Sequence, residues 1–306
     1  MRPLSTDERR TLAAATWLPV LGPYGALTER WTVHLDDPEL HALISASFID
    51  LLVDEAPPAA PGHGGACTQL RLTMSRTGTP VLARDDHRIG NPRDQVGAFA
   101  LLVWAINRLV LEDSSRQVHL LHAGGAVRSD GTAVLLPAPS GSGKSTLTLA
   151  LLERGLDYLS DEAVALDDDG RLHGYPKPVS IDDGAFPLFA RWRPPRAAAR
   201  ILGAQWQVPA SSVTGVAAEG QLRLVIFPCF QPGTRTHLEL LSPGAATIEA
   251  AACSFADPSR GHVTAEQVRR LAATVGRTPT YRLVMSEPEA ACELVLRQLD
   301  RIPYEG

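Results

Sequence analysis

The sequence contains very little lysine. Among its 306 residues are 29 basic ones, of which only Lys144 and Lys177 are lysine and the other 27 are arginine. We attribute the excess of arginine to codon composition. Arginine cannot replace a compact ammonium group on a flexible stem, so the two positions that keep lysine are the first candidates for a functional role.

Cysteine is also scarce. The four cysteines, Cys67, Cys229, Cys253 and Cys292, lie far apart and form no CxxC pair. Disulfide-held secreted domains and zinc sites use closer and more regular spacings. We therefore expect reduced, mostly buried thiols in a cytoplasmic protein, with neither a disulfide framework nor a zinc site.

Long hydrophobic runs are absent as well. The most apolar run, residues 98–111, is interrupted by Asn107 and Arg108 and is shorter than the about 20 residues of a membrane span. Residues 12–22 follow two acidic residues and lack a clean signal-peptide cleavage pattern. We expect a buried helix at 98–111 in a protein that is neither membrane-bound nor exported.

Charge of one sign is not concentrated in long runs. The 34 acidic and 29 basic residues give a net charge of −5, which argues against binding nucleic acid by neutralising its phosphates. The densest basic cluster comprises Arg191, Arg193, Arg196 and Arg200. It is either a mobile loop that clamps phosphate or an anionic substrate, or a merely solvated loop.

Length and composition are typical of a globular protein with one large or two modest domains. We expect a small α+β module at 1–92 and a second domain at 93–306. The predicted elements of the module are a strand at 31–35, a helix at 39–52, a Pro/Gly/Ala-rich loop at 56–66 and a hairpin of 68–76 and 80–84 around a turn at 77–79. Residues 85–95 are expected to link the two parts, before a helix at 97–112.

The second domain begins with a predicted β-hairpin. It is made of residues 118–128, a turn at 129–131 and an apolar strand at 132–136. Further strands are expected at 163–166, 221–227 and 236–241. Two C-terminal helices are expected to start at capping boxes, one formed by Thr264 with Gln267 and the other by Ser286 with Glu289.

A phosphate-binding motif follows the hairpin. The motif (A or G)-x-x-x-x-G-K-(S or T), with one further threonine, is matched by Ala138, Pro139, Ser140, Gly141, Ser142, Gly143, Lys144, Ser145 and Thr146. Small residues let backbone N–H groups converge on phosphate oxygens, and the helix expected at 145–154 adds its positive N-terminal end. We expect Lys144 to reach the β and γ phosphates of ATP and the Ser145 hydroxyl to ligate Mg²⁺.

Two adjacent acids, Asp161 and Glu162, come shortly after the motif helix. A kinase needs one carboxylate to accept the proton of the acceptor hydroxyl and others to hold Mg²⁺. An isolated Asp-Glu pair is typical of a solvated turn. Beside a phosphate loop we favour the divided catalytic roles, with both acids as candidate metal ligands.

These motifs are similar to those of one known family. His122-Ala123, the hairpin, the phosphate loop, Arg154-Gly155 and the segment 158–162 together resemble the HPr kinase/phosphorylase family, and most of all its divergent members that phosphorylate serine hydroxyls on peptides or small molecules. The resemblance covers residues 122–181 strongly and the C-terminal part more weakly.

The resemblance implies an α/β (α+β) fold like that of HPr kinase and phosphoenolpyruvate carboxykinase, with a phosphate-loop core on a mainly β scaffold. It implies a catalytic role for His122 and makes Asp161 the general base. Glu162 stands where family members commonly have a second aspartate. The family's second glycine-rich signature is not evident after Ile181.

The second lysine, Lys177, lies between Pro176 and Pro178. Flanking prolines preset the backbone, which lowers the cost of ordering an ammonium group aimed at phosphate. Lys177 is therefore a further candidate catalytic residue, and its alternative is an exposed loop lysine.

We expect a cytoplasmic, ATP- and Mg²⁺-dependent kinase that transfers the γ-phosphoryl group to a hydroxyl, chiefly of serine, on a peptide, a protein or a serine-like small molecule. One alternative is a true HPr serine kinase/phosphorylase. Another, from a different class, is a non-catalytic nucleotide-binding regulator or accessory protein. The resemblance also suggests a homo-oligomer, and no nucleic-acid or membrane partner is expected.

Overall fold

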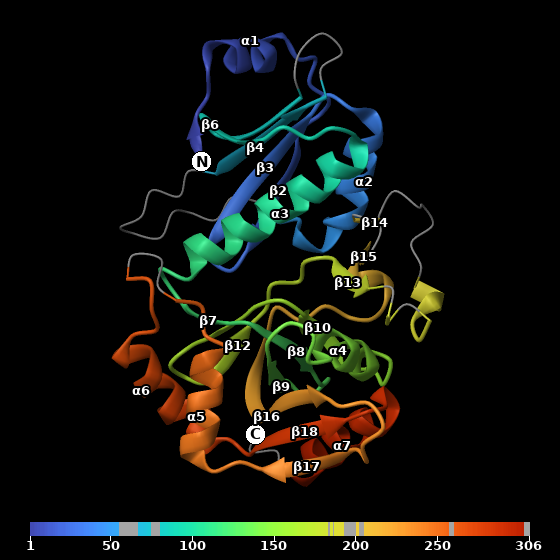
Figure 1. Ribbon diagram of the computed structural model, residues 1–306, viewed down its shortest axis with the longest axis vertical. Helices are drawn as coiled ribbons and strands as arrows, with labels where there is room; N and C mark the ends of the chain where they lie inside the picture. Colours follow the sequence, from blue (N-terminus) through green and yellow to red (C-terminus); the bar gives the residue numbers. More distant parts are fainter. Residues whose placement is uncertain are drawn as a thin grey trace. The chain divides into compact units, whose positions relative to one another are not determined.

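The computed structural model describes residues 1–54, 67–74, 80–182, 184–185, 187–192, 200–201, 205–256 and 260–302 (Figure 1). The chain has a mixed α/β fold. Its residues form two compact units, unit 1 (Met1–Asp113 and Asp182–Pro209) and unit 2 (Ser114–Ile181 and Ala210–Gly306). The division into domains 1–92 and 93–306 stays a prediction, and the compact units have different bounds.

Unit 1 is built on a mixed sheet. Its strands, in spatial order, are β1 (Arg2–Pro3), β6 (His87–Gly90), β5 (Val81–Arg84), β4 (Thr68–Thr73), β3 (Glu29–Leu35) and β2 (Leu21–Ala26). Only β3 and β4 run parallel among these pairs. In β3 the buried residues Trp31, Val33 and Leu35 alternate with partly exposed ones, the period that places one face of a strand in the core. The predicted strand at 31–35 is confirmed.

The helix predicted at 39–52 is shorter than expected. It runs as α2 (Pro38–Ser47) and is followed by a 3₁₀ turn (Ile49–Leu51). Asp37 caps this helix, because its side chain accepts hydrogen bonds from the backbone N–H groups of Glu39 and Leu40. The helix α1 (Thr6–Ala14) was not predicted, although Ser5 and Glu8 form a capping box at its start.

The hairpin predicted from 68–76 and 80–84 is present as the antiparallel pair β4 and β5. Its turn at 77–79 and the loop predicted at 56–66 lie outside the described residues. Residues 85–95 are not simply a linker, because they contain β6, which pairs with β5. The tight turn between these strands places Asp85 at φ 49°, a left-handed conformation that aspartate tolerates better than most residues.

The apolar run 98–111 lies in α3 (Gln95–Ser114), as predicted. The buried side chains recur at helical spacing: Ala98, Phe99, Leu102, Val103, Ala105, Ile106, Leu109 and Val110. By length and hydropathy α3 is the one helix in the described part of the chain that could cross a membrane, and 44% of its most apolar window is buried. Core helices of other proteins have the same properties, so this is weak evidence for a span.

Unit 1 also contains a segment from later in the chain. It includes a 3₁₀ turn (Ala190–Trp192) and the antiparallel pair β14 (Arg200–Ile201) and β15 (Gln205–Val208).

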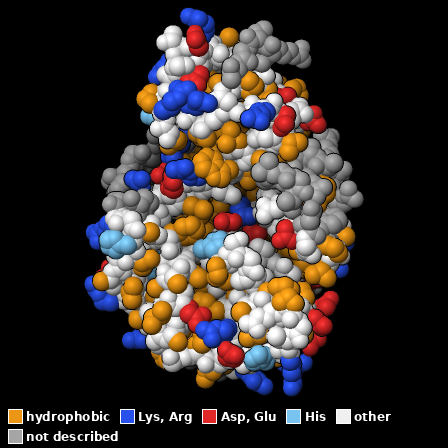
Figure 2. All heavy atoms as spheres, viewed as in Figure 1, with side chains coloured by type: hydrophobic (Ala, Val, Ile, Leu, Met, Phe, Trp, Pro, Cys, Tyr) orange, Lys and Arg blue, Asp and Glu red, His pale blue; other side chains and the backbone are white. Residues whose placement is uncertain are grey.

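On the face drawn in Figure 2, basic and acidic side chains are interspersed. This agrees with a sequence that has no long run of one charge.

Unit 2 is built on a second mixed sheet. The spatial order is β10 (Asp157–Ser160), β8 (Ala123–Val127), β9 (Thr132–Pro137), β16 (Glu219–Phe230), β12 (Arg171–His173), β11 (Val164–Leu166) and β7 (His119–Leu121). The second half of β16 also pairs with β18 (Thr280–Met285), which pairs with β17 (His237–Leu240). The strands β9, β16 and β18 run parallel, so their carboxyl ends point the same way. A further strand, β13 (Val179–Asp182), spans the point in the sequence where the chain passes from unit 2 to unit 1.

The predicted hairpin is formed by β8 and β9, with Gly131 in its turn at φ 83°. Its first strand is not continuous, however. The segment predicted at 118–128 is divided at His122 into β7, which pairs with β11, and β8, which pairs with β9. His122 therefore lies at a break between strands and not within one.

Helices surround this sheet (Figure 1): α4 (Lys144–Leu152), α5 (Pro243–Ala252), α6 (Ala265–Thr274) and α7 (Pro288–Arg301). The capping box of Thr264 and Gln267 at α6 is confirmed. The one predicted at Ser286 is wrong, because Pro288 occupies the first turn of α7 and Glu287 is the N-cap residue. The Ser286 hydroxyl instead donates to the Thr234 carbonyl at 2.8 Å.

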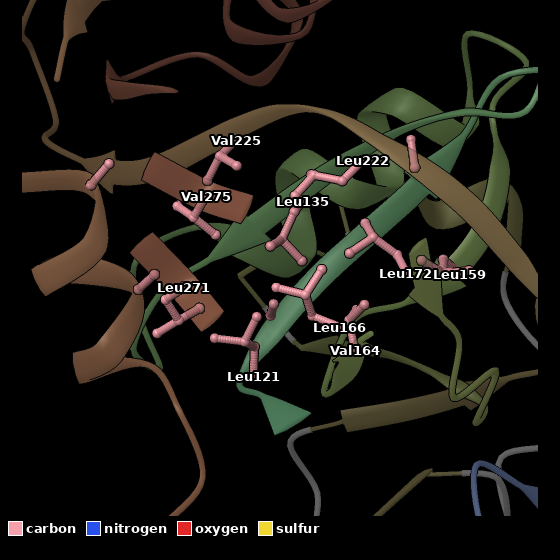
Figure 3. Packing of buried hydrophobic residues seen from close by; sticks show 14 of the residues in the cluster. Leu121, Leu135, Leu159, Val164, Leu166, Leu172, Leu222, Val225, Leu271 and Val275 are labelled. Atoms are coloured by element: carbon pink, nitrogen blue, oxygen red, sulfur yellow. The ribbon is translucent and has the colours of Figure 1, made fainter. Parts of the chain in front are cut away.

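A hydrophobic core joins the sheet of unit 2 to α5 and α6 (Figure 3). It combines Leu135 of β9, Leu159 of β10 and Val225 of β16 with Leu271 of α6 and Val275. The loop after β9 and the turn after β10 are therefore both anchored in one packed cluster.

The cysteines are all free, but the expectation that most are buried is wrong. Cys292 is buried, and Cys67, Cys229 and Cys253 are partly exposed.

Candidate phosphate-transfer site

The phosphate-motif residues form a loop between a strand and a helix, which is the context that the motif requires. Strand β9 is buried along its whole length, and α4 begins directly at Lys144. Gly141 and Gly143 have backbone φ angles of 81° and 86°, which residues with a Cβ rarely adopt. The two glycines therefore let the backbone turn sharply enough for its N–H groups to converge.

The start of α4 has no side-chain cap. Gly143 is the N-cap residue and offers no side-chain acceptor to the first turn. The hydroxyl Oγ of Ser142 is buried and has no hydrogen-bond partner among the described residues. Free N–H groups, a helix dipole and an unsatisfied hydroxyl at one place suit an anion such as phosphate.

Lys144 is buried and contacts His122. Its Nζ donates a hydrogen bond to His122 Nε2 at 3.2 Å. The other ring nitrogen, Nδ1, donates to the backbone oxygen of Glu162 at 2.9 Å and lies 3.7 Å from Glu162 Oε1. Because a carbonyl oxygen only accepts, Nδ1 carries the proton and His122 is neutral in this arrangement.

The electrostatics agree with a neutral histidine. Burial and the ammonium of Lys144 lower the pKa of His122 below its usual value. Burial also lowers the pKa of Lys144, although the carboxylates of Asp161 and Glu162 act in the opposite direction. The charge of Lys144 is therefore poorly solvated here, a condition that an incoming phosphate would relieve.

The turn after β10 carries both acids. Its shape comes from Ser160, whose buried hydroxyl accepts hydrogen bonds from the backbone N–H groups of Glu162 and Ala163 at 3.2 and 3.1 Å. Asp161 points into the protein and its side chain is only 2% exposed, whereas that of Glu162 is 33% exposed. The two carboxylates therefore have different environments despite being adjacent in sequence.

Asp161 is held by three donors. Its Oδ1 accepts from the Tyr158 hydroxyl at 2.7 Å and lies 2.8 Å from Lys177 Nζ, and its Oδ2 accepts from the Ser180 N–H at 3.3 Å. Burial alone would raise the pKa of this carboxyl, but the Lys177 ammonium and these hydrogen bonds hold it below its usual range. Asp161 is thus a buried carboxylate kept in its charged form.

Lys177 is positioned differently from both sequence-based alternatives. It is 1% exposed, so it is not an exposed loop lysine. Its Nζ donates to the Pro178 carbonyl at 3.1 Å and the Ser180 hydroxyl at 3.0 Å, besides its ion pair with Asp161. All three N–H groups are used, so the ammonium is directed at Asp161 and not at a phosphate.

The donor set fits Mg²⁺ in the manner usual for nucleotide enzymes. Among the described residues, no group of three or more His, Cys, Asp or Glu side chains could hold a metal by itself. Magnesium is ordinarily held by one or two carboxylates together with substrate phosphates. Ser145 at the start of α4 and the partly exposed Glu162 offer oxygens of this kind. Asp161, the third predicted ligand, has its Oδ1 occupied by the Tyr158 hydroxyl and the Lys177 ammonium.

The structure therefore brings together His122, Lys144, Asp161, Glu162 and Lys177 in unit 2. Tyr158 and Ser180 contact Asp161 and were missed as individual site residues. Tyr158 stands three residues before Asp161, but nothing in the local pattern indicates that its hydroxyl turns inward.

The arginine cluster is only partly described by the structure. Arg191 lies in unit 1, where its guanidinium stacks on the Trp192 ring at 5.3 Å. Arg193 and Arg196 lie outside the described residues, and only the backbone of Arg200 is described. The clamp and solvated-loop interpretations of this cluster both stay predictions.

Comparison with protein families and with curated proteins gives no match. Among solved structures, the Hpr(Ser) kinase/phosphatase from Coxiella burnetii is weakly similar, with 14% identity and a TM-score of 0.31 over 60% of this chain and 97% of that one. A similarity at this level carries no argument about activity. The function of this chain has to be inferred from its own residues.

Proposed function

We propose that this protein is an ATP- and Mg²⁺-dependent kinase with an HPr-kinase-like phosphate-loop domain, which transfers the γ-phosphoryl group to a hydroxyl of a peptide, a protein or a serine-like small molecule. One observation carries the proposal. The loop lysine, Lys144, is linked through His122 to the turn that carries two carboxylates. A phosphate-binding loop beside paired acids is the equipment that phosphoryl transfer to a hydroxyl needs.

Nucleotide binding is the first step of this proposal. The backbone N–H groups from Ser140 to Ser145 would hold the β-phosphate, and the unpartnered Ser142 hydroxyl would gain an acceptor. Lys144 would exchange its hydrogen bond with neutral His122 for contacts with the β and γ phosphates. Mg²⁺, held by Ser145 and Glu162 with the phosphates, would neutralise charge that develops during transfer.

Asp161 would accept the proton of the acceptor hydroxyl. Its Oδ1 is occupied by Tyr158 and Lys177, whereas Oδ2 accepts only the long hydrogen bond from Ser180 among the described residues. Oδ2 is therefore the oxygen that the hydroxyl would approach. The lowered pKa of Asp161 keeps it deprotonated and ready to accept.

Lys177 supports this role as a positioning residue. It fixes the orientation of the Asp161 carboxylate and offsets the cost of burying its charge. This function differs from direct contact with phosphate, which the sequence had suggested.

The test combines transfer and binding. Purified protein is incubated with Mg²⁺, ATP and a panel of serine-containing peptides, HPr and serine-like small molecules, and acceptors that gain one phosphate are identified by mass spectrometry. Asp161→Asn should lose transfer and keep nucleotide binding. Asp169→Asn is the matched control, because Asp169 is an exposed acid in the turn before β12. Full turnover of Asp161→Asn would exclude it as the base, and modification of HPr alone would favour the true HPr kinase. ATP binding without any product would favour the non-catalytic regulator.

A further inference from the structure

A large aromatic side chain is exposed beside the phosphate loop. Phe230 is the last residue of β16, and it is 49% exposed. Its backbone N–H donates to the Ser142 carbonyl at 3.1 Å, so the end of β16 is tied directly to the loop. The backbone of Phe230 is therefore held next to the residues that would bind phosphate, and its ring projects from that point.

Phe230 is supported by its neighbours at the ends of two parallel strands, β16 and β18. Met285, the last residue of β18, is 3% exposed, and a Cβ at Gly143 would collide with its Cε atom and come within 3.5 Å of Phe230 Cβ. The backbone N–H of Gln231 donates to the Met285 carbonyl at 2.9 Å. Because β16 and β18 are paired along six residues, the sheet supports the position of Phe230.

The order of strands gives the loop two different sides. On one side of β9 lie β8 and then β10, which lead to His122 and to the turn with Asp161 and Glu162. On the other side lies β16, which ends at Phe230. The acids and the exposed ring therefore flank the loop strand from opposite directions.

If the function proposed above holds, these two sides fix the direction in which a nucleoside triphosphate lies across the loop. The γ-phosphate must lie toward the acids, since transfer takes place there. The nucleoside at the other end of the triphosphate then extends toward β16. Aromatic rings are common partners of nucleobases because every base has a π-face on which a ring can stack.

We propose that the ring of Phe230 is the stacking platform for the nucleobase of the bound nucleotide. The inference rests on the proposed nucleotide binding and adds a base-binding subsite to it. It assigns Phe230 a contact with the base alone, so the residue has no part in holding phosphates.

The experiment compares a nucleotide with a ligand that lacks the base. Binding of ATP and of inorganic tripolyphosphate, each with Mg²⁺, is measured by calorimetry for the wild-type protein and for Phe230→Ala. Loss of base–aromatic stacking should weaken ATP binding by about 5- to 150-fold and leave tripolyphosphate binding unchanged. Leu240→Ala is the matched control, because Leu240 is a 72% exposed apolar residue on the same sheet.

A second variant reports on the contact directly. All five native tryptophans, Trp17, Trp31, Trp104, Trp192 and Trp206, belong to unit 1. Phe230→Trp therefore introduces the first indole into unit 2. Relative to the wild type, its added fluorescence should change on binding ATP and not on binding tripolyphosphate, and its ATP affinity should stay near that of the wild type.

The outcomes separate this inference from the proposed function. Equal effects of Phe230→Ala on ATP and tripolyphosphate, or no effect on either, would overturn the base platform while phosphate binding stands. If the wild-type protein binds neither ligand, or Lys144→Ala weakens neither, the nucleotide site itself is refuted and the platform falls with it.

Discussion

The buried ion pair of Lys177 and Asp161 makes a quantitative prediction. Both side chains are 2% exposed, with 2.8 Å between Nζ and Oδ1. Lys177→Met removes the ammonium and keeps most of the side-chain volume, which leaves an uncompensated carboxylate in the interior. Breaking a buried pair in this way costs about 3–5 kcal/mol. We expect a loss of that size in the free energy of unfolding near pH 8, measured by urea denaturation with circular dichroism.

The pH dependence gives this prediction its sign. In the wild type the pKa of Asp161 is lowered, so its stabilising contribution is complete above the unfolded value of about 3.9 and is lost only as pH falls through the folded pKa. Without Lys177, burial dominates and raises the pKa of Asp161. The variant should therefore lose stability as pH rises from about 5 to 8, where this carboxylate adds no pH dependence in the wild type.

A double substitution completes the cycle. Asp161→Asn combined with Lys177→Met removes both charges. Near pH 8 the double variant should be less destabilised than the Lys177→Met variant, because no unpaired charge remains. Hydrogen exchange of peptides covering β10 and β11 should show the same order of protection. A Lys177→Met variant within about 1 kcal/mol of the wild type, with an unchanged pH profile, would refute the buried pair.

Three further predictions concern the loop and one helix start. Lys144→Arg should abolish transfer despite keeping the charge, because the buried site next to His122 suits a compact ammonium; a phosphotransfer assay near the wild-type rate would contradict this. Gly143→Ala should cost stability and nucleotide binding through its φ and through the need to displace the buried Met285 side chain, whereas Gly141→Ala, at a similar φ in open space, should cost only about 1–2 kcal/mol. Equal effects in denaturation would refute the steric argument. Thr264→Ala should lower stability by about 1 kcal/mol through loss of the α6 cap, and an unchanged thermal midpoint would contradict the cap.

The phosphate loop was predictable from sequence because its determinants are contiguous. A buried strand, small residues with two glycines, a lysine and a helix follow one another along residues 132–152. Each of these signals acts over a few residues, so pattern and local conformation agree. The β8–β9 hairpin and the α6 cap were predictable for the same reason.

The partners of the site residues were not predictable, because they depend on pairing between distant segments. The break at His122 arises since β7 and β8 pair with different strands. Lys177 meets Asp161 across 16 positions of chain, and its flanking prolines gave no indication of a buried carboxylate as its partner. A resemblance in motif suggested which residues matter, whereas the direction in which Lys177 points needed the fold.

Two adjacent acids illustrate how the fold places similar residues in different environments. Asp161 is buried and paired with a lysine, whereas Glu162 is partly exposed and lies beside His122. The sequence could divide the base and metal roles between them only by analogy. Their different exposure and partners now support Asp161 as the buried base and Glu162 as the more accessible metal ligand within the proposed function.

The most direct test of the proposed kinase activity is phosphate transfer from ATP to a hydroxyl acceptor, followed by mass spectrometry of the acceptor and by ADP formation. We predict one added phosphate per ADP formed with the wild-type protein, and loss of transfer with retained ATP binding in Asp161→Asn. A wild-type protein that binds ATP and Mg²⁺ but modifies no acceptor of the panel, or an Asp161→Asn variant with full turnover, would contradict the proposal.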